Sequence, residues 1–143
     1  MYQFIAREAP ECRINEQYLS DFERQFELRL PPVLREYYLL YNGSQMHEVP
    51  FISKGYQFCA IEILTLKYGT TPVEALLIHQ AAADEIPDSY VPFALDEDYD
   101  YYYWNKDSGH IVYINREDVD NPLPVCDDMN QFFAILEKVR KEG

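Results

Sequence analysis

Three aspartates, Asp96, Asp98 and Asp100, alternate along one short segment of the chain. Calcium loops of the EF-hand type begin with oxygen ligands at alternate positions. Such a loop also needs a glycine at its sixth position and a bidentate glutamate at its twelfth, where this chain has Tyr101 and Asp107. We therefore interpret the segment as a solvated acidic turn, with a calcium loop as the alternative. Its acidity can serve a basic partner without any metal.

No other set of residues has the spacing that catalysis or metal binding requires. General acid–base catalysis needs two carboxylates at a defined separation, which an abundance of acids does not provide. The sequence contains no GxSxG, P-loop, GxGxxG or HExxH motif. Cys12, Cys59 and Cys126 form no CxxC pair, and the histidines are not spaced as metal ligands. We expect no enzyme, no cofactor and no metal site, and a buried thiol at Cys59.

The negative charge of the chain is concentrated in one stretch. From Asp84 to Asp128 there are thirteen acidic residues against two basic ones, Lys106 and Arg116. The remaining residues are nearly balanced, with twelve acidic and ten basic side chains, although the whole chain carries −13. Such a field attracts a positively charged partner. It argues against nucleic acid, whose phosphates are bound by Lys and Arg.

Length and residue usage favour a single intracellular domain. The 143 residues contain no linker, repeat or low-complexity tract. An odd number of widely spaced cysteines fits a reducing, cytoplasmic compartment. The N-terminal segment lacks the apolar core of a signal peptide, and no apolar run approaches the roughly 20 residues that cross a bilayer. We expect a cytoplasmic protein that binds neither membrane nor nucleic acid.

Apolar residues at three- and four-residue spacing predict four helices. Side chains that accept hydrogen bonds, prolines and an Asn-Gly pair mark their ends. The predicted helices are one capped by Asn15 and stopped by Pro31, one from Pro32 to Asn42-Gly43, one over Pro72–Ile86, and one capped by Asp127 or Asp128.

Runs of β-branched and aromatic residues predict the strands. They are Val49–Ser53, Gln57–Leu66, Tyr90–Leu95 and a hairpin of Tyr99–Trp104 with His110–Asn115. In the first strand of that hairpin, Tyr101 and Tyr103 lie on one face, whereas Tyr102 and Trp104 lie on the other beside Asp100. If the first pair points inward, the second face is either covered by a helix or open as a binding surface.

Several short segments, taken in order, resemble the SMI1/KNR4 family, also called the SUKH superfamily. They are Leu30–Tyr38, Tyr41–Gly43, Val91–Ala94 with Asp96, Gly109–Tyr113 and Phe132-Phe133. The resemblance spans about residues 15 to 140. Family members carry a glycine shortly after the central aspartate, but this chain has Glu97, Asp98 and Tyr99, so its turn must use Asp98 or another non-glycine residue.

The resemblance implies both a fold and a type of function. The implied fold is α+β: one domain over residues 1–143, with a mixed, mostly antiparallel, strongly bent β-sheet flanked by N-terminal, middle and C-terminal helices. Many bacterial members look like immunity proteins that bind and neutralise a toxin, often a nuclease. Fungal relatives are linked to cell-wall glucan synthesis and its signalling. These functions share a binding module and have no catalytic chemistry in common.

Charge pattern and resemblance together predict a non-catalytic, protein-binding immunity protein for a basic toxin, with a nuclease as one candidate. The alternative is a regulatory scaffold related to the fungal glucan-synthesis regulators. In this hypothesis, carboxylates imitate the phosphates that a nuclease expects, and aromatic side chains supply packing. The candidate partner-binding residues are Asp84, Glu85, Asp88, Asp96, Glu97, Asp98, Asp100, Tyr102, Trp104, Glu117, Asp118 and Asp120.

Overall fold

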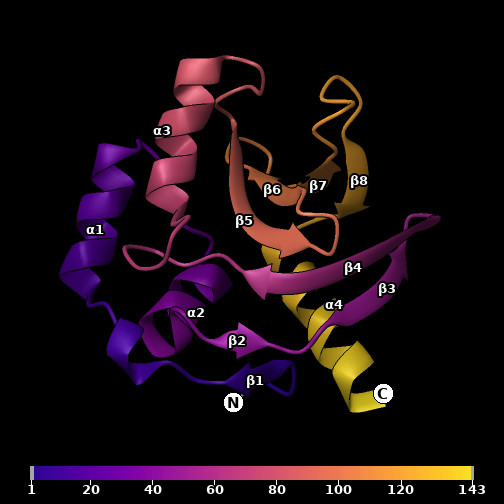
Figure 1. Cartoon of the computed structure of the whole chain (residues 1–143), viewed down its shortest axis with the longest axis horizontal. Helices are drawn as coiled ribbons and strands as arrows, with labels where there is room; N and C mark the ends of the chain where they lie inside the picture. The colour runs from indigo at the N-terminus through magenta and orange to yellow at the C-terminus, as the bar shows by residue number, and fades with distance from the viewer. Residues whose placement is uncertain (1, 143) are drawn as a thin grey trace.

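The computed structural model describes residues 2–142, so the two end residues of the predicted domain, 1 and 143, lie outside the described part. Figure 1 shows the arrangement of its helices and strands. In chain order they are β1 (Ile5–Arg7), the 3₁₀ helix η1 (Pro10–Cys12), α1 (Glu16–Gln25), α2 (Pro32–Tyr41), β2 (Gln45–Met46), β3 (Val49–Ser53), β4 (Tyr56–Ile63), α3 (Val73–Ala83), β5 (Tyr90–Asp96), β6 (Tyr101–Asn105), β7 (Ile111–Ile114), β8 (Leu123–Cys126) and α4 (Met129–Glu142).

Six strands form one sheet in the order β3-β4-β5-β6-β7-β8, and β1 pairs with β2 in a separate small sheet. Each described pairing is antiparallel. The predicted α+β architecture is therefore confirmed. The large sheet is strongly bent (Figure 1), so that its two outer strands approach each other. The Ser53 hydroxyl donates a hydrogen bond to the Val125 carbonyl, and Lys54 pairs with Asp127 at 3.2 Å.

Helix α4 packs against the inner side of the bent sheet. The ring of Phe132 lies 5.0 Å from that of Phe93, 5.4 Å from that of Tyr102 and 6.1 Å from that of Phe51, measured between centroids. These rings belong to β5, β6 and β3. One aromatic side chain of α4 thus contacts strands from both halves of the sheet.

Both faces of β6 are covered, which answers the question that the sequence left open. Tyr102 is 0% exposed and Trp104 is 3% exposed, so the expectation that they offer binding contacts is wrong. Their side chains face α4, whereas Tyr101 and Tyr103 border a small cavity beneath α3. A helix on each face explains how four consecutive aromatic residues fit within one strand.

All four predicted helices form, but α1 ends at Gln25, well before the predicted stop at Pro31, and Glu27 adopts the left-handed conformation beyond it. The Asn15 side chain accepts a hydrogen bond from the Tyr18 amide at 2.8 Å, and Asp128 does the same for Gln131 at the start of α4. Helix α3 ends earlier than expected, because Asp84 adopts the left-handed conformation. Strands β1, β2 and β8 were not predicted. Among residues 2–142, no helix has the length and apolar character needed to cross a membrane.

Asn42 and Gly43 join three distant parts of the chain. The buried Asn42 amide donates to the carbonyls of Cys12 and Leu66 at 2.8 and 2.9 Å, and its oxygen accepts from the Leu66 amide at 2.9 Å. Gly43 has a φ of +82°, and a Cβ there would lie 2.6 Å from the Cys12 Cβ. The Asn-Gly pair is therefore required by packing as well as by the end of α2.

We expect Asn42→Ala to lower the free energy of unfolding by about 3 kcal/mol or more, because it leaves buried backbone groups of Cys12 and Leu66 without partners. Urea unfolding of the variant beside the parent measures this loss. Asn121→Ala is the matched control, since that exposed amide bonds only Asp118, and it should change stability by less than about 0.5 kcal/mol. Equal stabilities for the two variants would contradict this role of Asn42.

Candidate functional site

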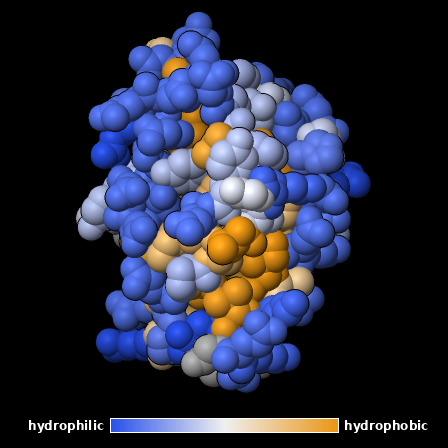
Figure 2. Space-filling model, turned by 90° about the vertical axis from the view of Figure 1, so that its right-hand side faces the viewer, coloured by the Kyte–Doolittle hydropathy of each residue, from blue (hydrophilic) through white to orange (hydrophobic). Residues whose placement is uncertain are grey.

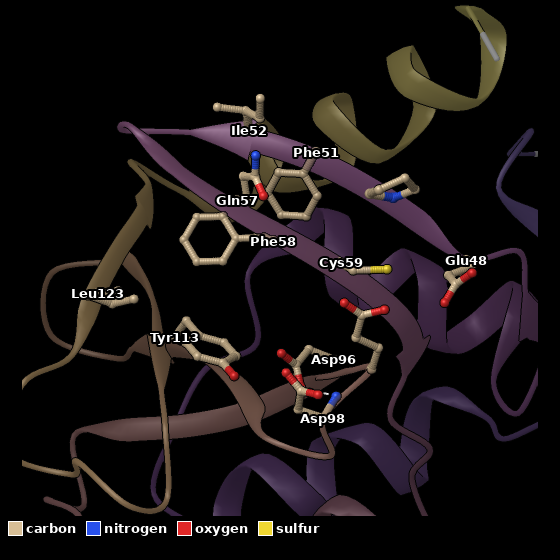
Figure 3. A pocket seen from close by; sticks show the side chains of 12 residues that line it. Glu48, Phe51, Ile52, Gln57, Phe58, Cys59, Asp96, Asp98, Tyr113 and Leu123 are labelled. Atoms are coloured by element: carbon tan, nitrogen blue, oxygen red, sulfur yellow. Dashed lines mark hydrogen bonds between the residues drawn. The ribbon is translucent and has the colours of Figure 1, made fainter.

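A hollow of about 610 Å³ opens between the β3–β4 hairpin, the turn from β5 to β6, and strands β7 and β8. Figure 3 shows the hairpin on one side, Asp96 and Asp98 opposite it, and Tyr113 and Leu123 closing the end. The lining residues are Glu48, Pro50, Phe51, Ile52, Gln57, Phe58, Cys59, Asp96, Glu97, Asp98, Tyr113 and Leu123.

The hollow combines an apolar floor with an acidic border. The rings of Phe58 and Tyr113 lie 5.9 Å apart at the floor. Four of the lining side chains are carboxylates, and none of those described is basic. Glu48, Glu97 and Asp98 are exposed at the border. An aromatic base surrounded by uncompensated negative charge suits a positively charged protein segment better than a small apolar ligand.

Glu48 and Glu97 converge on the thiol of Cys59. Their ligand atoms and the Cys59 sulfur all lie within 4.8 Å of one another. Burial and the charges of Glu97 and Glu48 raise the pKa of Cys59 to about 11. The thiol is therefore protonated near neutral pH, as expected for a buried cysteine, and is a poor nucleophile.

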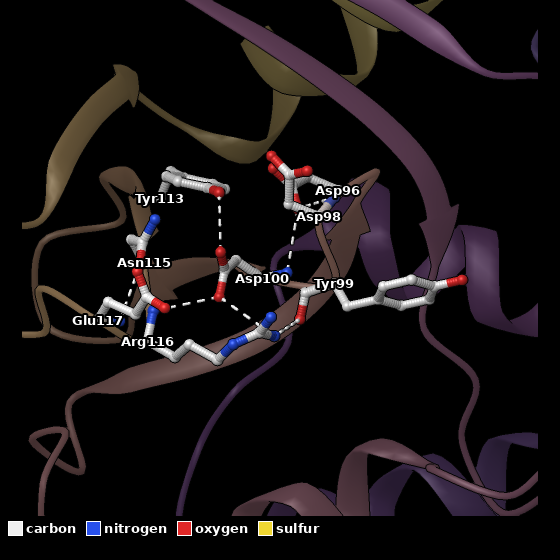
Figure 4. Close-up of polar contacts among 8 residues, drawn as sticks. All are labelled: Asp96, Asp98, Tyr99, Asp100, Tyr113, Asn115, Arg116 and Glu117. Carbon is white, nitrogen blue, oxygen red and sulfur yellow. Dashed lines mark hydrogen bonds and ion pairs between the residues drawn. The ribbon is translucent and has the colours of Figure 1, made fainter.

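The turn between β5 and β6 is built around the side chain of Asp96. Its Oδ1 accepts hydrogen bonds from the amides of Asp98 and Asp100 at 2.9 and 3.0 Å (Figure 4). Tyr99 occupies the left-handed position with a φ of +63°. The turn thus uses Tyr99, not Asp98, at the residue that needs positive φ. The Asp96 amide donates to the Asp100 carbonyl at 2.9 Å, which closes a loop of three residues, Glu97–Tyr99. A three-residue loop with one left-handed residue is a common hairpin geometry, and here it leaves Glu97 and Asp98 exposed.

Asp100 is held inside the fold and does not form part of an exposed charged surface. It is 4% exposed. Its carboxylate accepts from the Tyr113 hydroxyl at 3.2 Å and the Arg116 amide at 3.1 Å, and the Arg116 guanidinium lies 3.8 Å away (Figure 4). Burial, together with Asp96, raises the pKa of Tyr113, so that its hydroxyl remains a donor. The predicted contact role of Asp96 and Asp100 is corrected to a structural one.

The other predicted acidic residues do not join this hollow. Asp84 and Asp88 border a second hollow of about 590 Å³ between the ends of α1 and α3, which also includes Lys106. Glu85 borders the small cavity beneath α3. Figure 1 places the α3–β5 and β7–β8 connections at the top of the molecule, away from the β5–β6 turn near β4.

Glu117, Asp118 and Asp120 are exposed in the β7–β8 connection. The acidic stretch of the sequence is therefore divided between separate parts of the surface.

The sequence did not predict that the β3–β4 hairpin forms part of this site. Glu48, Ile52 and Gln57 line the hollow, yet they precede the acidic stretch, which begins at Asp84, by 27 to 36 residues. Figure 2 views the side of the molecule on which the hairpin turn lies, and shows apolar side chains gathered among hydrophilic ones. Ile52 is 72% exposed. An exposed isoleucine in an alternating strand was the one available signal.

The order of elements and the position of the Asn-Gly pair can now be compared with known families. A family model described as SMI1 / KNR4 family (SUKH-1) matches residues 13–135. The chain belongs to this family. A comparison with curated proteins finds no match. Membership of the SMI1/KNR4 family supports a protein-binding module of the immunity-protein type.

We expect Asp100→Asn to destabilise the fold by about 1–3 kcal/mol, because an amide places a donor where the carboxylate now accepts from Tyr113 and Arg116. Asp98→Asn is the matched control, since its side chain is exposed at the same turn, and it should change stability by less than about 0.5 kcal/mol. Thermal unfolding of both variants tests this, and a similar melting temperature for the two would contradict it.

The Cys59 thiol should react slowly with iodoacetamide until the pH approaches its raised pKa of about 11. Glu97→Gln removes a neighbouring negative charge, so it lowers that pKa and should speed alkylation a few-fold at about pH 9. Peptide mass spectrometry resolves the rate at Cys59 from that at Cys126, which serves as an internal reference. An unchanged or slower rate at Cys59 would contradict the inferred coupling.

Proposed function

We propose that this SMI1/KNR4 protein is an immunity protein that binds a basic toxin through the acidic hollow beside β4. The observation that carries the proposal is the set of four carboxylates around an aromatic floor, with no basic side chain among the described lining residues. Three of these carboxylates, on Glu48, Glu97 and Asp98, are exposed and form no ion pair within residues 2–142.

The proposed mechanism is occlusion of the functional surface of the toxin. Clustered carboxylates attract a basic surface from a distance and raise the association rate. Exposed apolar groups of the hairpin, Ile52 above all, then exclude water from the contact. The hollow needs no chemical step to act in this way.

The test first looks for a basic protein encoded beside this gene and then measures how the two proteins bind. We expect their affinity to fall as salt rises, because screening shortens the reach of the carboxylates from about 10 Å at 0.1 M to about 3 Å at 1 M. Glu97→Gln with Asp98→Asn should weaken binding by at least about tenfold, mainly through slower association. Stopped-flow measurements at several salt concentrations separate the rate constants.

Glu117→Gln with Asp118→Asn is the matched control, because it removes the same charge from the β7–β8 connection. If that pair weakens binding and the Glu97/Asp98 pair does not, the hollow is not the contact surface. If the neighbouring protein does not bind and the native partner is a kinase or a synthase, the immunity function is wrong and a scaffold role replaces it.

A further inference from the structure

Strand β4 is paired on both sides for only part of its length. Its pairing with β3 runs from Tyr56 to Ala60, whereas its pairing with β5 begins at Ala60, opposite Asp96. The segment Tyr56–Cys59 therefore has a strand on one side only. Its other edge borders the acidic hollow, as Figure 3 shows. In a strand, backbone N–H and C=O groups alternate between the two edges, so this edge presents to the hollow groups that no strand pairs with.

The outer edges of the sheet are protected, but this inner edge is not. Strands β3 and β8 carry exposed prolines, Pro50 and Pro124, which cannot donate to an added strand. The segment Tyr56–Cys59 contains no proline or lysine. Four residues extend over roughly 13 Å, the length of a short strand. The free backbone edge of Tyr56–Cys59 thus lies against the aromatic and acidic lining of the hollow.

We propose that the hollow takes an extended, basic segment of the partner protein as an added strand beside β4. This inference rests on the proposed function and names how the partner is held. Side chains of an added strand would alternate between two environments. One is the aromatic floor of Phe58 and Tyr113, and the other is the acidic side, where Glu48 and Glu97 surround Cys59. The matching segment alternates apolar residues with Lys or Arg.

Charge complementarity favours such a partner over a second copy of this chain. A second copy would bring its own −13 net charge and its own acidic hollow to the contact. A basic segment replaces that repulsion with attraction, and the backbone hydrogen bonds fix its direction and register. The proposal therefore commits to a basic strand.

The test uses a blocked peptide of alternating lysine and valine with the full ¹⁵N-labelled protein. We expect shifts in the amide signals of Gln57, Phe58 and Cys59, and slower hydrogen exchange at that edge. Only alternate residues of an added strand turn their N–H groups toward β4, so the control is a pair of peptides with the same side chains, one N-methylated at the valines and one at the lysines. One of the two cannot complete the ladder and should bind at least about tenfold more weakly. A peptide of alternating glutamate and valine should not bind. Glu97→Lys should weaken binding, whereas Asp118→Lys should not.

Three results would overturn the proposal: no binding of the lysine–valine peptide at about 1 mM, signal changes centred away from β4, or undiminished affinity for both N-methylated peptides. Undiminished affinity for both refutes strand addition alone and leaves an acidic surface for a basic partner. The proposed function fails by a different result, when the Glu97 and Asp98 substitutions leave the affinity for the basic toxin unchanged.

Discussion

The packing of Phe132 between distant strands determines the shape on which the other features depend. Its ring contacts Phe51 from the first strand of the large sheet and Phe93 and Tyr102 from the middle. To bury one ring against all of them, the sheet must bend around α4. Bending brings the end of β3 to β8, where Ser53 bonds the Val125 carbonyl. It also separates the hairpin from the β5–β6 turn, which creates the hollow.

The acidic segment of the chain serves two purposes that its charge count does not distinguish. Asp96 and Asp100 are buried and accept hydrogen bonds, so they shape the turn and connect it to β7. Glu97 and Asp98 are exposed by that same turn. Removing a carboxylate from water costs free energy. Asp96 and Asp100 can be buried because each accepts hydrogen bonds from defined donors, which also fix its position. The exposed charges are thereby held at defined positions.

Local features of the fold could be predicted from sequence, and features that depend on pairing could not. Helical periodicity and the Asn15 cap were sufficient for the start and the buried face of α1, because both act within a few residues. Strand alternation correctly placed Tyr102 and Trp104 on the same face of β6, but it did not show that α4 covers that face. The closeness of Cys59 to Glu97 depends on where β4 leaves β5, and no local pattern encodes that register.

The bonds of Asn42 show that the residues that hold the fold together differ from those of the proposed contact surface. Asn42 and Gly43 hold the N-terminal segment to the chain beyond β4, on the scaffold. Glu48, Glu97 and Asp98 stand around the hollow and make no such connections. The border of the hollow can therefore accept substitutions at little cost in stability, whereas the Asn-Gly pair cannot. A protein built in this way can change what it binds without redesigning what keeps it folded.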